Sequence, residues 1–492
     1  MIEKLRQKIL GFINAPKDVP LLAGFSVGIY MVLFYYAQNY SLANSWQQLL
    51  YLVGYYAVLP AVVLFAAYKI VGFTPFKAYQ KNILFVGMIA FLSYYIIEIV
   101  HVPLSKKVAL AGVIGLSAIV SFWFKQYYKL FVILLLFLSL FNLYTVTGII
   151  VSTQIASAEW QKLPDTIDKA VFKQKPNIYY IQPDGYTNAE NLKGDNYKFD
   201  NSDFDGYLKQ SGFKVYDGFR SNYHTTLLSN SSMFAMQHHY AQEDMDPYNA
   251  RNVIISNNPV LRALKGNGYR TSFITERPYL IINRPKMGYD FCNFDYNELP
   301  YFQDGWSSQR DVTSDLRLQI NKNKKTGNFY FIEKMTPGHI NNNAPSLGID
   351  GERAAYLERI KEANIWLKEI LSLITKADPN AIVIIGADHG GFAGFEYMGK
   401  TENLITDTKL NKSMYGALLA IKWNNPAYND YDADLKTSVN LFRTVFAFLS
   451  EDKGYLKNYQ KNDSYMRTLR PSGVYKYIND AGLPVIEPVQ SK

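Results

Sequence analysis

The stretch that decides the fold is residues 381–391, AIVIIGADHGG, in which an apolar run leads directly into Asp388 and His389. A run of this length that stops at turn residues predicts a buried β-strand. Residues 177–186, NIYYIQPDGY, repeat the pattern and place Asp184 directly after a second such strand. Either aspartate alone fits a turn residue or a helix cap. An Asp-His pair at the exit of an apolar strand needs a charged partner, and carboxylate and imidazole are both metal ligands, so we expect a divalent cation there.

Strand-like and helix-like segments alternate around these two stretches. Further strands are expected at 270–274, 328–332 and 417–423, and helices at 226–237, 259–267 and 353–374. This alternation predicts an α/β domain with a mostly parallel sheet sandwiched by helices. Such sheets carry their chemistry at the carboxyl ends of the strands, which is where Asp184 and Asp388 lie in the sequence pattern.

The first third of the chain is predicted to be a membrane anchor. Residues 19–68 contain no Asp, Glu, Lys or Arg, and about 20 apolar residues are enough for one helical span. A bundle of five transmembrane helices is expected, at 20–38, 49–68, 83–102, 108–124 and 130–152.

The distribution of Lys and Arg orients these spans. Basic residues occur before the first span, between the second and third, and between the fourth and fifth, and segments rich in them lie in the cytoplasm. Lys106 and Lys107, before the fourth span, disagree mildly with this rule. An odd number of spans then places the rest of the chain outside. We therefore expect a transmembrane domain at 1–152, a connector at 153–175 and an extracytoplasmic domain at 176–492.

Composition excludes several classes of function. The formal charge is +9, but residues 1–150 hold 11 Lys and Arg against 3 Asp and Glu, which leaves 40 against 39 for the remainder. The larger domain is therefore close to neutral, and we expect no nucleic-acid partner. Cys292 is the only cysteine, so an intramolecular disulfide and a multi-cysteine zinc site are both excluded.

The motifs, taken in order, resemble the sulfatase and alkaline-phosphatase superfamily. The most similar branch is its membrane-anchored one, the lipoteichoic acid synthases and phosphoethanolamine transferases, in which transmembrane helices precede an extracytoplasmic α/β domain. The motifs that carry the resemblance are IQPDGY at 181–186, SNYHTTLLSNSSMF at 221–234, TPGH at 336–339 and IIGADHGG at 384–391. The resemblance implies a location in the bacterial cytoplasmic membrane.

In the resembling family the segment at 221–234 supplies the nucleophile, and this role also has a physical basis in the residues themselves. A threonine at the start of a helix presents its hydroxyl among free backbone N–H groups, and a nearby metal lowers the pKa of that hydroxyl. Thr225 and Thr226 both satisfy this description, and a Thr pair that opens a helix also fits a simple cap. The spacing in the resembling family favours Thr226.

The resemblance implies roles for seven residues and a cofactor. The metal ligands are Asp184, Thr226, Asp388 and His389; the catalytic residues are Thr226 and His339; and the substrate-binding residues are Asn283, Arg284 and His339. The cofactor is one or two divalent ions, which these ligands leave open as Mn, Mg or Zn. His339 is expected to protonate a leaving oxygen or to hold a phosphate oxygen, and Arg284 to neutralise charge.

The chain departs from the family pattern at three points. Asp184 stands where the branch often has Glu, Ile282 stands where lipoteichoic acid synthases have Trp, and the disulfides usual in Gram-negative phosphoethanolamine transferases are impossible here. The headgroup is therefore left open between phosphoglycerol and phosphoethanolamine.

The expected function is metal-dependent transfer of a phospho-headgroup through a phospho-threonine intermediate. The expected donor is a membrane phospholipid and the acceptor is a glycan or a lipid. Two alternatives remain: a membrane-anchored hydrolase of phosphodiesters or sulfate esters, and a relative that binds without catalysis. A formylglycine sulfatase is not expected, because Cys292 lies in Phe-Cys-Asn-Phe and no Cys-x-Pro-x-Arg occurs.

Overall fold

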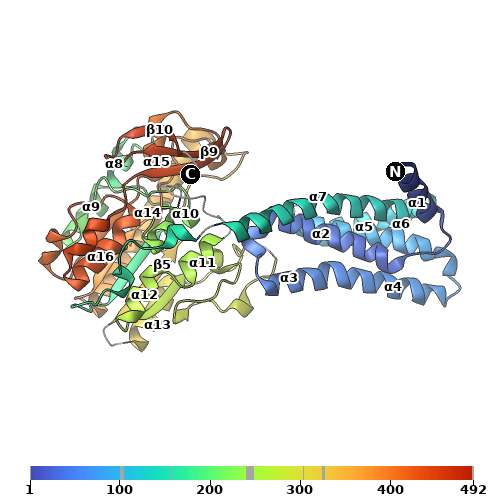
Figure 1. Ribbon diagram of the computed structural model, residues 1–492, viewed down its shortest axis with the longest axis horizontal. Helices are drawn as coiled ribbons and strands as arrows, with labels where there is room; N and C mark the ends of the chain where they lie inside the picture. Colours follow the sequence, from blue (N-terminus) through green and yellow to red (C-terminus); the bar gives the residue numbers. More distant parts are fainter. Residues whose placement is uncertain are drawn as a thin grey trace. The chain divides into compact units, whose positions relative to one another are not determined.

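The structure is a computed structural model, and its elements are drawn in Figure 1. It describes residues 2–99, 105–156, 158–239, 249–302, 304–323 and 327–489. The chain divides into two compact units. The first comprises Met1–Ile155 and Pro300–Asp304, and the second comprises Ala156–Leu299 and Gly305–Lys492.

The first unit is helical. Its helices are α1 (Ile2–Asn14), α2 (Pro20–Ala43), α3 (Trp46–Leu52), the π-helical η1 (Val53–Val58), α4 (Leu59–Gly72), α5 (Gln80–Ile99), α6 (Lys106–Phe124) and α7 (Tyr128–Ile155). Within the described residues, four segments are long and apolar enough to cross a membrane: Pro20–Ala43, Trp46–Gly72, Lys77–Glu98 and Lys106–Ile155. This unit is therefore a membrane domain.

The predicted number of five spans differs from these four segments at one place. The fourth segment, Lys106–Ile155, contains both α6 and α7, which the sequence predicts as separate spans and which are joined by a 3-10 turn at Lys125–Tyr127. Residues 100–102 of the predicted third span lie outside the described residues. Five crossings therefore stay a prediction.

The second unit is built on a seven-stranded sheet with the order β2-β7-β6-β1-β5-β3-β4. The strands are β1 (Ile178–Pro183), β2 (Lys214–Val215), β3 (Arg270–Thr275), β4 (Phe291–Cys292), β5 (Asn328–Lys334), β6 (Ile382–Gly386) and β7 (Leu419–Lys422). From β6 to β4 all pairings are parallel, whereas β7 runs antiparallel to both β6 and β2. The prediction of an α/β domain with a mostly parallel sheet is confirmed.

Helices cover both faces of this sheet. The helices of the unit are α8 (Ala189–Lys193), α9 (Ser202–Gln210), α10 (Thr226–Ala235), α11 (Ala250–Ile255), α12 (Pro259–Gly266), α13 (Val312–Lys322), α14 (Gly348–Ala377), α15 (Thr408–Tyr415) and α16 (Leu441–Ser450). Neighbouring residues of a strand point to opposite faces. Tyr180 of β1 packs against Phe234 of α10 and Phe442 of α16, whereas the hydroxyl of Tyr179 donates to Asp378, directly after α14.

A second, three-stranded antiparallel sheet follows near the C-terminus. It consists of β8 (Ser464–Leu469), β9 (Ser472–Ile478) and β10 (Pro484–Pro488). The sequence pattern did not predict it. The backbone N–H of Tyr465 donates to the carbonyl of Asn222 (2.8 Å), so this sheet braces the loop that leads into α10.

Candidate active site

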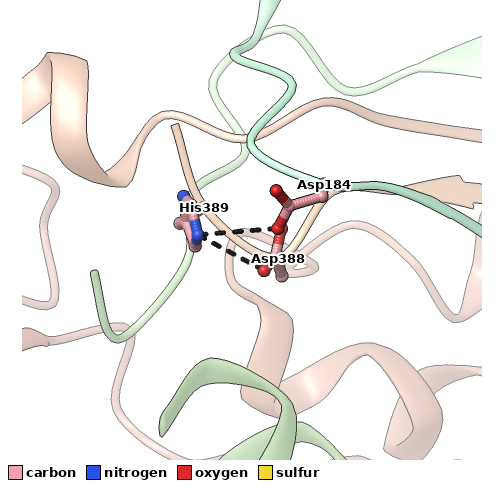
Figure 2. A group of neighbouring side chains, drawn as sticks. All are labelled: Asp184, Asp388 and His389. Carbon is pink, nitrogen blue, oxygen red and sulfur yellow. Dashed lines mark ion pairs between the residues drawn. The ribbon is translucent and has the colours of Figure 1, made fainter. Parts of the chain in front are cut away.

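Asp184, Asp388 and His389 come together at the carboxyl ends of two neighbouring strands. Asp184 follows β1, and Asp388 and His389 follow β6, to which β1 is paired in parallel. Each of the three offers a ligand atom within 4.8 Å of the others, and all three side chains are buried. Figure 2 shows the three side chains converging on one point.

The tautomer of His389 follows from its hydrogen bond. Its Nδ1 lies 2.8 Å from the carbonyl oxygen of Gly390, and a carbonyl can only accept, so Nδ1 carries the hydrogen. The other nitrogen, Nε2, lies 3.4 Å from Asp388 Oδ2 and 3.9 Å from Asp184 Oδ1. Among the described residues, Asp388 Oδ2 has no hydrogen-bond partner. Two carboxylates and a ring nitrogen that meet in this way require a positive charge, either a proton on Nε2 or a metal ion.

The pKa values of Asp184 and His389 also indicate that this site requires positive charge. Burial and repulsion by Asp388 raise the pKa of Asp184 from 3.8 to about 7. Burial lowers the pKa of His389, but the Asp388 and Asp184 carboxylates outweigh it and raise that pKa overall. Without a metal, the site therefore holds protons at pH values where isolated carboxylates would be charged. The donor set of two carboxylates and one imidazole fits Mn, Mg or Zn.

Thr226 is the threonine that reaches this group. It is the first residue of α10, and its Oγ1 donates to Asp184 Oδ1 (3.2 Å) and lies 3.3 Å from His389 Nε2. The free N–H groups of the first helical turn surround this position and favour negative charge there. Thr225 is the N-cap residue, but its side chain makes no capping hydrogen bond. The roles of Thr226 as ligand and nucleophile stay predictions that this geometry supports.

His339 lies beside the group, on the loop that follows β5. Its ring centroid is 5.9 Å from that of His389, and its Nδ1 lies 2.7 Å from the carbonyl oxygen of Ile340. The hydrogen therefore sits on Nδ1, and Nε2 carries a lone pair. Burial and repulsion by His389 lower the pKa of His339 to about 4. The imidazole is therefore neutral at pH 7 and keeps its lone pair on Nε2.

Asn283 and Arg284 lie on the turn after the 3-10 helix η7 (Pro278–Ile281). Asn283 is buried, and Arg284 has a φ of 55°, in the left-handed region that a long side chain rarely adopts. The Arg284 guanidinium donates to the carbonyls of Leu299 (2.7 Å) and Ile282 (3.5 Å). One of these carbonyls belongs to the turn itself and the other lies fifteen residues along the chain. A role in binding substrate stays a prediction for both Asn283 and Arg284.

The remaining histidines of this region divide into two kinds. His238 and His239 each place a ring nitrogen against a backbone carbonyl, of Lys461 and Leu228 respectively, and are packed within the fold. His224 is buried, and burial together with repulsion by His389 lowers its pKa to about 3. His224 is therefore a buried, neutral side chain at pH 7.

Glu333, the residue before the last in β5, was not predicted from the sequence. It is fully buried and accepts a hydrogen bond from Thr275 Oγ1 (2.9 Å). Burial raises its pKa well above the usual value, and the charges of Asp184 and Asp388 add to this shift. The signal was present, because Glu333 directly follows the apolar run 329–332, as Asp388 follows the run in β6.

No protein-family model and no curated protein matches this chain. Among solved structures, the chain is similar to the integral membrane lipooligosaccharide phosphoethanolamine transferase EptA of Neisseria meningitidis, at 11% identity and a TM-score of 0.40, covering 87% of this chain and 95% of that one. It is also similar to the periplasmic domain of EptC from Escherichia coli, at 11% identity and a TM-score of 0.41, covering 62% of this chain and 93% of that one. A third similar structure is the lipoteichoic acid synthase LtaP of Listeria monocytogenes, at 15% identity and a TM-score of 0.40, covering 66% of this chain and 92% of that one. The predicted resemblance to these two kinds of transferase is confirmed as a similarity, and the role of each residue has to come from the geometry of this chain.

Proposed function

We propose that this protein is a metal-dependent phosphotransferase that moves a phospho-headgroup from a membrane phospholipid to an acceptor hydroxyl. The observation that carries the proposal is the position of the Thr226 hydroxyl, which is hydrogen-bonded to Asp184 and 3.3 Å from His389 Nε2. A hydroxyl beside two carboxylates and an imidazole at a helix N-terminus is placed to become a nucleophile rather than to cap the helix.

Asp184, Asp388 and His389 would hold the divalent cation, with Thr226 as a further ligand. When bound, the cation supplies the positive charge that lowers the pKa of a nearby hydroxyl and offsets charge on a phosphate. In the first half of the reaction, a bond forms between Thr226 Oγ1 and phosphorus, and the bond from phosphorus to the diacylglycerol oxygen breaks. Diacylglycerol takes up the proton that Thr226 loses.

The second half reverses these steps with a different alcohol. The acceptor oxygen bonds to phosphorus, the Oγ1–P bond breaks, and the proton of the acceptor hydroxyl returns to Thr226. His339 is the group that we assign to carry this proton, because its Nε2 keeps a lone pair and its ring centroid is 5.9 Å from that of His389. Glycans and lipids both offer hydroxyls that suit this step.

The five-span membrane topology belongs to the same proposal. The hydroxyl of Tyr128, at the start of α7, donates to Asp18 (2.9 Å), and Lys81, at the start of α5, lies 3.9 Å from the same carboxylate. Asn82 of α5 donates to Ser121 near the end of α6 (2.9 Å). The end of α6 and the start of α7 therefore lie at one end of the helical unit, which supports two separate crossings and an extracytoplasmic position for residues 176–492.

A membrane anchor suits a lipid donor. Phospholipid is confined to the bilayer, and attachment of the catalytic domain to the same membrane raises the effective concentration of one for the other. The cytoplasmic membrane of a bacterium is the location we propose, with the active site on its outer face.

The test is release of diacylglycerol by the full-length protein in detergent micelles that contain either phosphatidylglycerol or phosphatidylethanolamine. We expect release from one of the two lipids, dependent on added Mn, Mg or Zn and abolished by a chelator. The lipid that is consumed identifies the headgroup. Failure to release diacylglycerol from either lipid, together with hydrolysis of a soluble phosphodiester, would instead support the hydrolase.

A further inference from the structure

We propose that one face of α14, formed by Glu352, Tyr356 and Arg359, positions His339 relative to the metal group, that is, the three side chains of Asp184, Asp388 and His389. This inference rests on the proposed role of His339 as the proton carrier. The three residues are spaced at i, i+4 and i+7 and therefore share one side of the helix. Each contacts the backbone of a loop that carries site residues.

Arg359 holds the loop at His339 itself. Its Nε donates to the carbonyl of Pro337 (2.7 Å) and its Nη2 to the carbonyl of His339 (2.9 Å). A planar guanidinium that bonds two carbonyls two residues apart fixes both the position and the orientation of the peptide between them. A lysine at this position has a single nitrogen and loses the planar fork.

Glu352 holds the same loop further along. Its carboxylate accepts hydrogen bonds from the backbone N–H of Asn341 (2.9 Å), from the side chain of Asn341 (2.7 Å) and from the backbone N–H of Leu347 (3.0 Å). The side chain is 2% exposed, so these bonds are shielded from competing water. The loop from Pro337 to Leu347 is thus fastened to α14 on both sides of Ile340.

Tyr356 connects the same helix to the two loops of the metal group. Its hydroxyl accepts from the backbone N–H of Thr187 (3.1 Å) and donates to the carbonyl of Gly185 (2.9 Å), next to Asp184. On the other side, a Cβ at Gly391 would lie 2.2 Å from the Tyr356 ring. The loops after β1 and β6 therefore pack against the residue that lies between Glu352 and Arg359.

The three loops are also joined to one another where they meet. The N–H of Gly338 donates to the carbonyl of Asp184 (2.8 Å), and the N–H of Ile340 donates to the carbonyl of Gly391 (3.3 Å). His339 lies between these two bonds, and its own Nδ1 faces the carbonyl of Ile340. The ring orientation and tautomer of His339 therefore depend on a backbone that α14 holds in place.

The test compares full-length variants Arg359→Ala and Arg359→Lys with Glu358→Gln. Glu358 is the neighbouring exposed residue, paired with Lys361 on the outer side of α14, and its substitution is expected to change nothing. For Arg359→Ala we expect diacylglycerol release to slow by about tenfold to 100-fold, because a small displacement of a catalytic group has effects of this size. Arg359→Lys is expected to fall between the wild type and Arg359→Ala.

Two further readouts separate positioning from a loss of folding. A nitrophenyl phosphodiester has a leaving group that departs without a proton, so its initial burst of nitrophenolate should fall less in Arg359→Ala than diacylglycerol release does. The metal affinity of Arg359→Ala should be unchanged. Arg359→Ala added to His339→Ala should cause no additional loss, because Arg359 acts only through His339. Equal losses on both substrates, or additive effects of the two substitutions, would overturn the proposal.

A substrate-free measurement keeps the inference separate from the proposed function. If the wild type cleaves neither ester, the proposed function fails, but nitrogen NMR of ¹⁵N-histidine-labelled protein still reports the tautomer of His339, with His339→Ala as the assignment control. We expect the Nδ1–H form in the wild type and a mixture of tautomers in Arg359→Ala. An unchanged His339 signal in Arg359→Ala would overturn the positioning role.

Discussion

His339 and His389 make the same local hydrogen bond, which leaves the lone pair on Nε2. In each, Nδ1 donates to the carbonyl of the next residue, Ile340 or Gly390, and Nε2 is left to act as ligand or base. The sequence shows a histidine at each of these two positions but does not indicate which ring nitrogen carries the hydrogen. That choice depends on backbone torsions after the histidine, which place the next carbonyl within reach of Nδ1.

The two neighbouring threonines give a matched pair of variants. Thr226→Ala should reduce turnover by more than about 10⁴-fold, the scale seen when a covalent nucleophile is removed. Thr225→Ala should retain most activity, because the Thr225 side chain makes no capping hydrogen bond. Steady-state diacylglycerol release measures both. Comparable losses in the two variants would contradict the assignment of Thr226.

The metal group makes stability depend on pH in a defined direction. Because the pKa of Asp184 rises from 3.8 to about 7 in the metal-free fold, the folded state keeps a proton that the unfolded chain has released. The contribution of Asp184 to the free energy of unfolding of the metal-free protein therefore falls as pH rises from about 4 to about 7. The raised pKa of His389 acts in the same direction at higher pH.

A bound metal replaces these protons, so its stabilising effect should grow with pH. We expect the metal-induced rise in Tm to be small near pH 5 and largest near pH 8, by linkage between proton and metal binding. Thermal denaturation with and without Mn, Mg or Zn measures this difference. Asp388→Asn is the control and should abolish the metal effect. A metal-induced rise that is the same at both pH values would contradict the assigned ligands.

At the scale of elements, the buried strands were predictable because their signal is local. β1 and β6 are continuous apolar runs that stop at turn residues, and every residue in both is buried. Since the sheet is parallel at β1 and β6, the residue after each strand lies at the same edge, and Asp184 and Asp388 meet there. The prediction of the metal group followed from two runs of sequence and one rule of sheet geometry.

Features that depend on distant partners were not predictable in the same way. The segment 417–423 gives β7, but its antiparallel direction relative to β6 depends on the connection 387–418, which contains α15 and carries no pattern of direction. The strands β8 to β10 are partly exposed and contain mixed polar residues, so their hydrophobic alternation is weak. The inward turn of Arg284 depends on the carbonyl of Leu299, fifteen residues away.

The packing of α14 against the loop after β6 leads to a prediction about two glycines. Gly391→Ala would place a Cβ 2.2 Å from the Tyr356 ring, and such overpacking costs about 1–3 kcal/mol. Gly206 lies inside α9, and a Cβ added there would meet no other atom within 4 Å among the described residues. Replacing a helical Gly by Ala at such an open position stabilises by about 0.5–1 kcal/mol.

Thermal denaturation should therefore separate the two variants in sign. We expect a lower Tm for Gly391→Ala and an unchanged or slightly higher Tm for Gly206→Ala. Activity should fall only in Gly391→Ala, because only this change displaces the Tyr356 ring. A Tm for Gly391→Ala equal to that of the wild type would show that the loop after β6 is not held against α14.

At the scale of the whole molecule, the sequence separated a helical membrane unit from an α/β unit by composition alone. The absence of charge from residues 19–68 and the excess of Lys and Arg in the first 150 residues both reflect the demands of a bilayer. The assignment of Pro300–Asp304 to the helical unit was beyond prediction, because these five residues lie far from the helices in the sequence.

Single cysteines introduced into the full-length protein test the proposed membrane topology. In a Cys292→Ser background, Asp195→Cys, at an exposed site of the α/β unit, should react with a membrane-impermeant maleimide in intact cells. Lys77→Cys, between α4 and α5, should react only after the membrane is opened. Labelling of Lys77→Cys in intact cells, or protection of Asp195→Cys, would contradict the proposed orientation.

The most direct test of the central claim is the mass of the peptide that contains Thr225 and Thr226, taken from protein quenched during turnover. The full-length protein is incubated with metal and with phosphatidylglycerol or phosphatidylethanolamine, without an acceptor, and fragmentation locates any added mass. We expect phosphoglycerol or phosphoethanolamine to be attached to Thr226. Diacylglycerol release without any adduct, or an adduct on another residue, would contradict it.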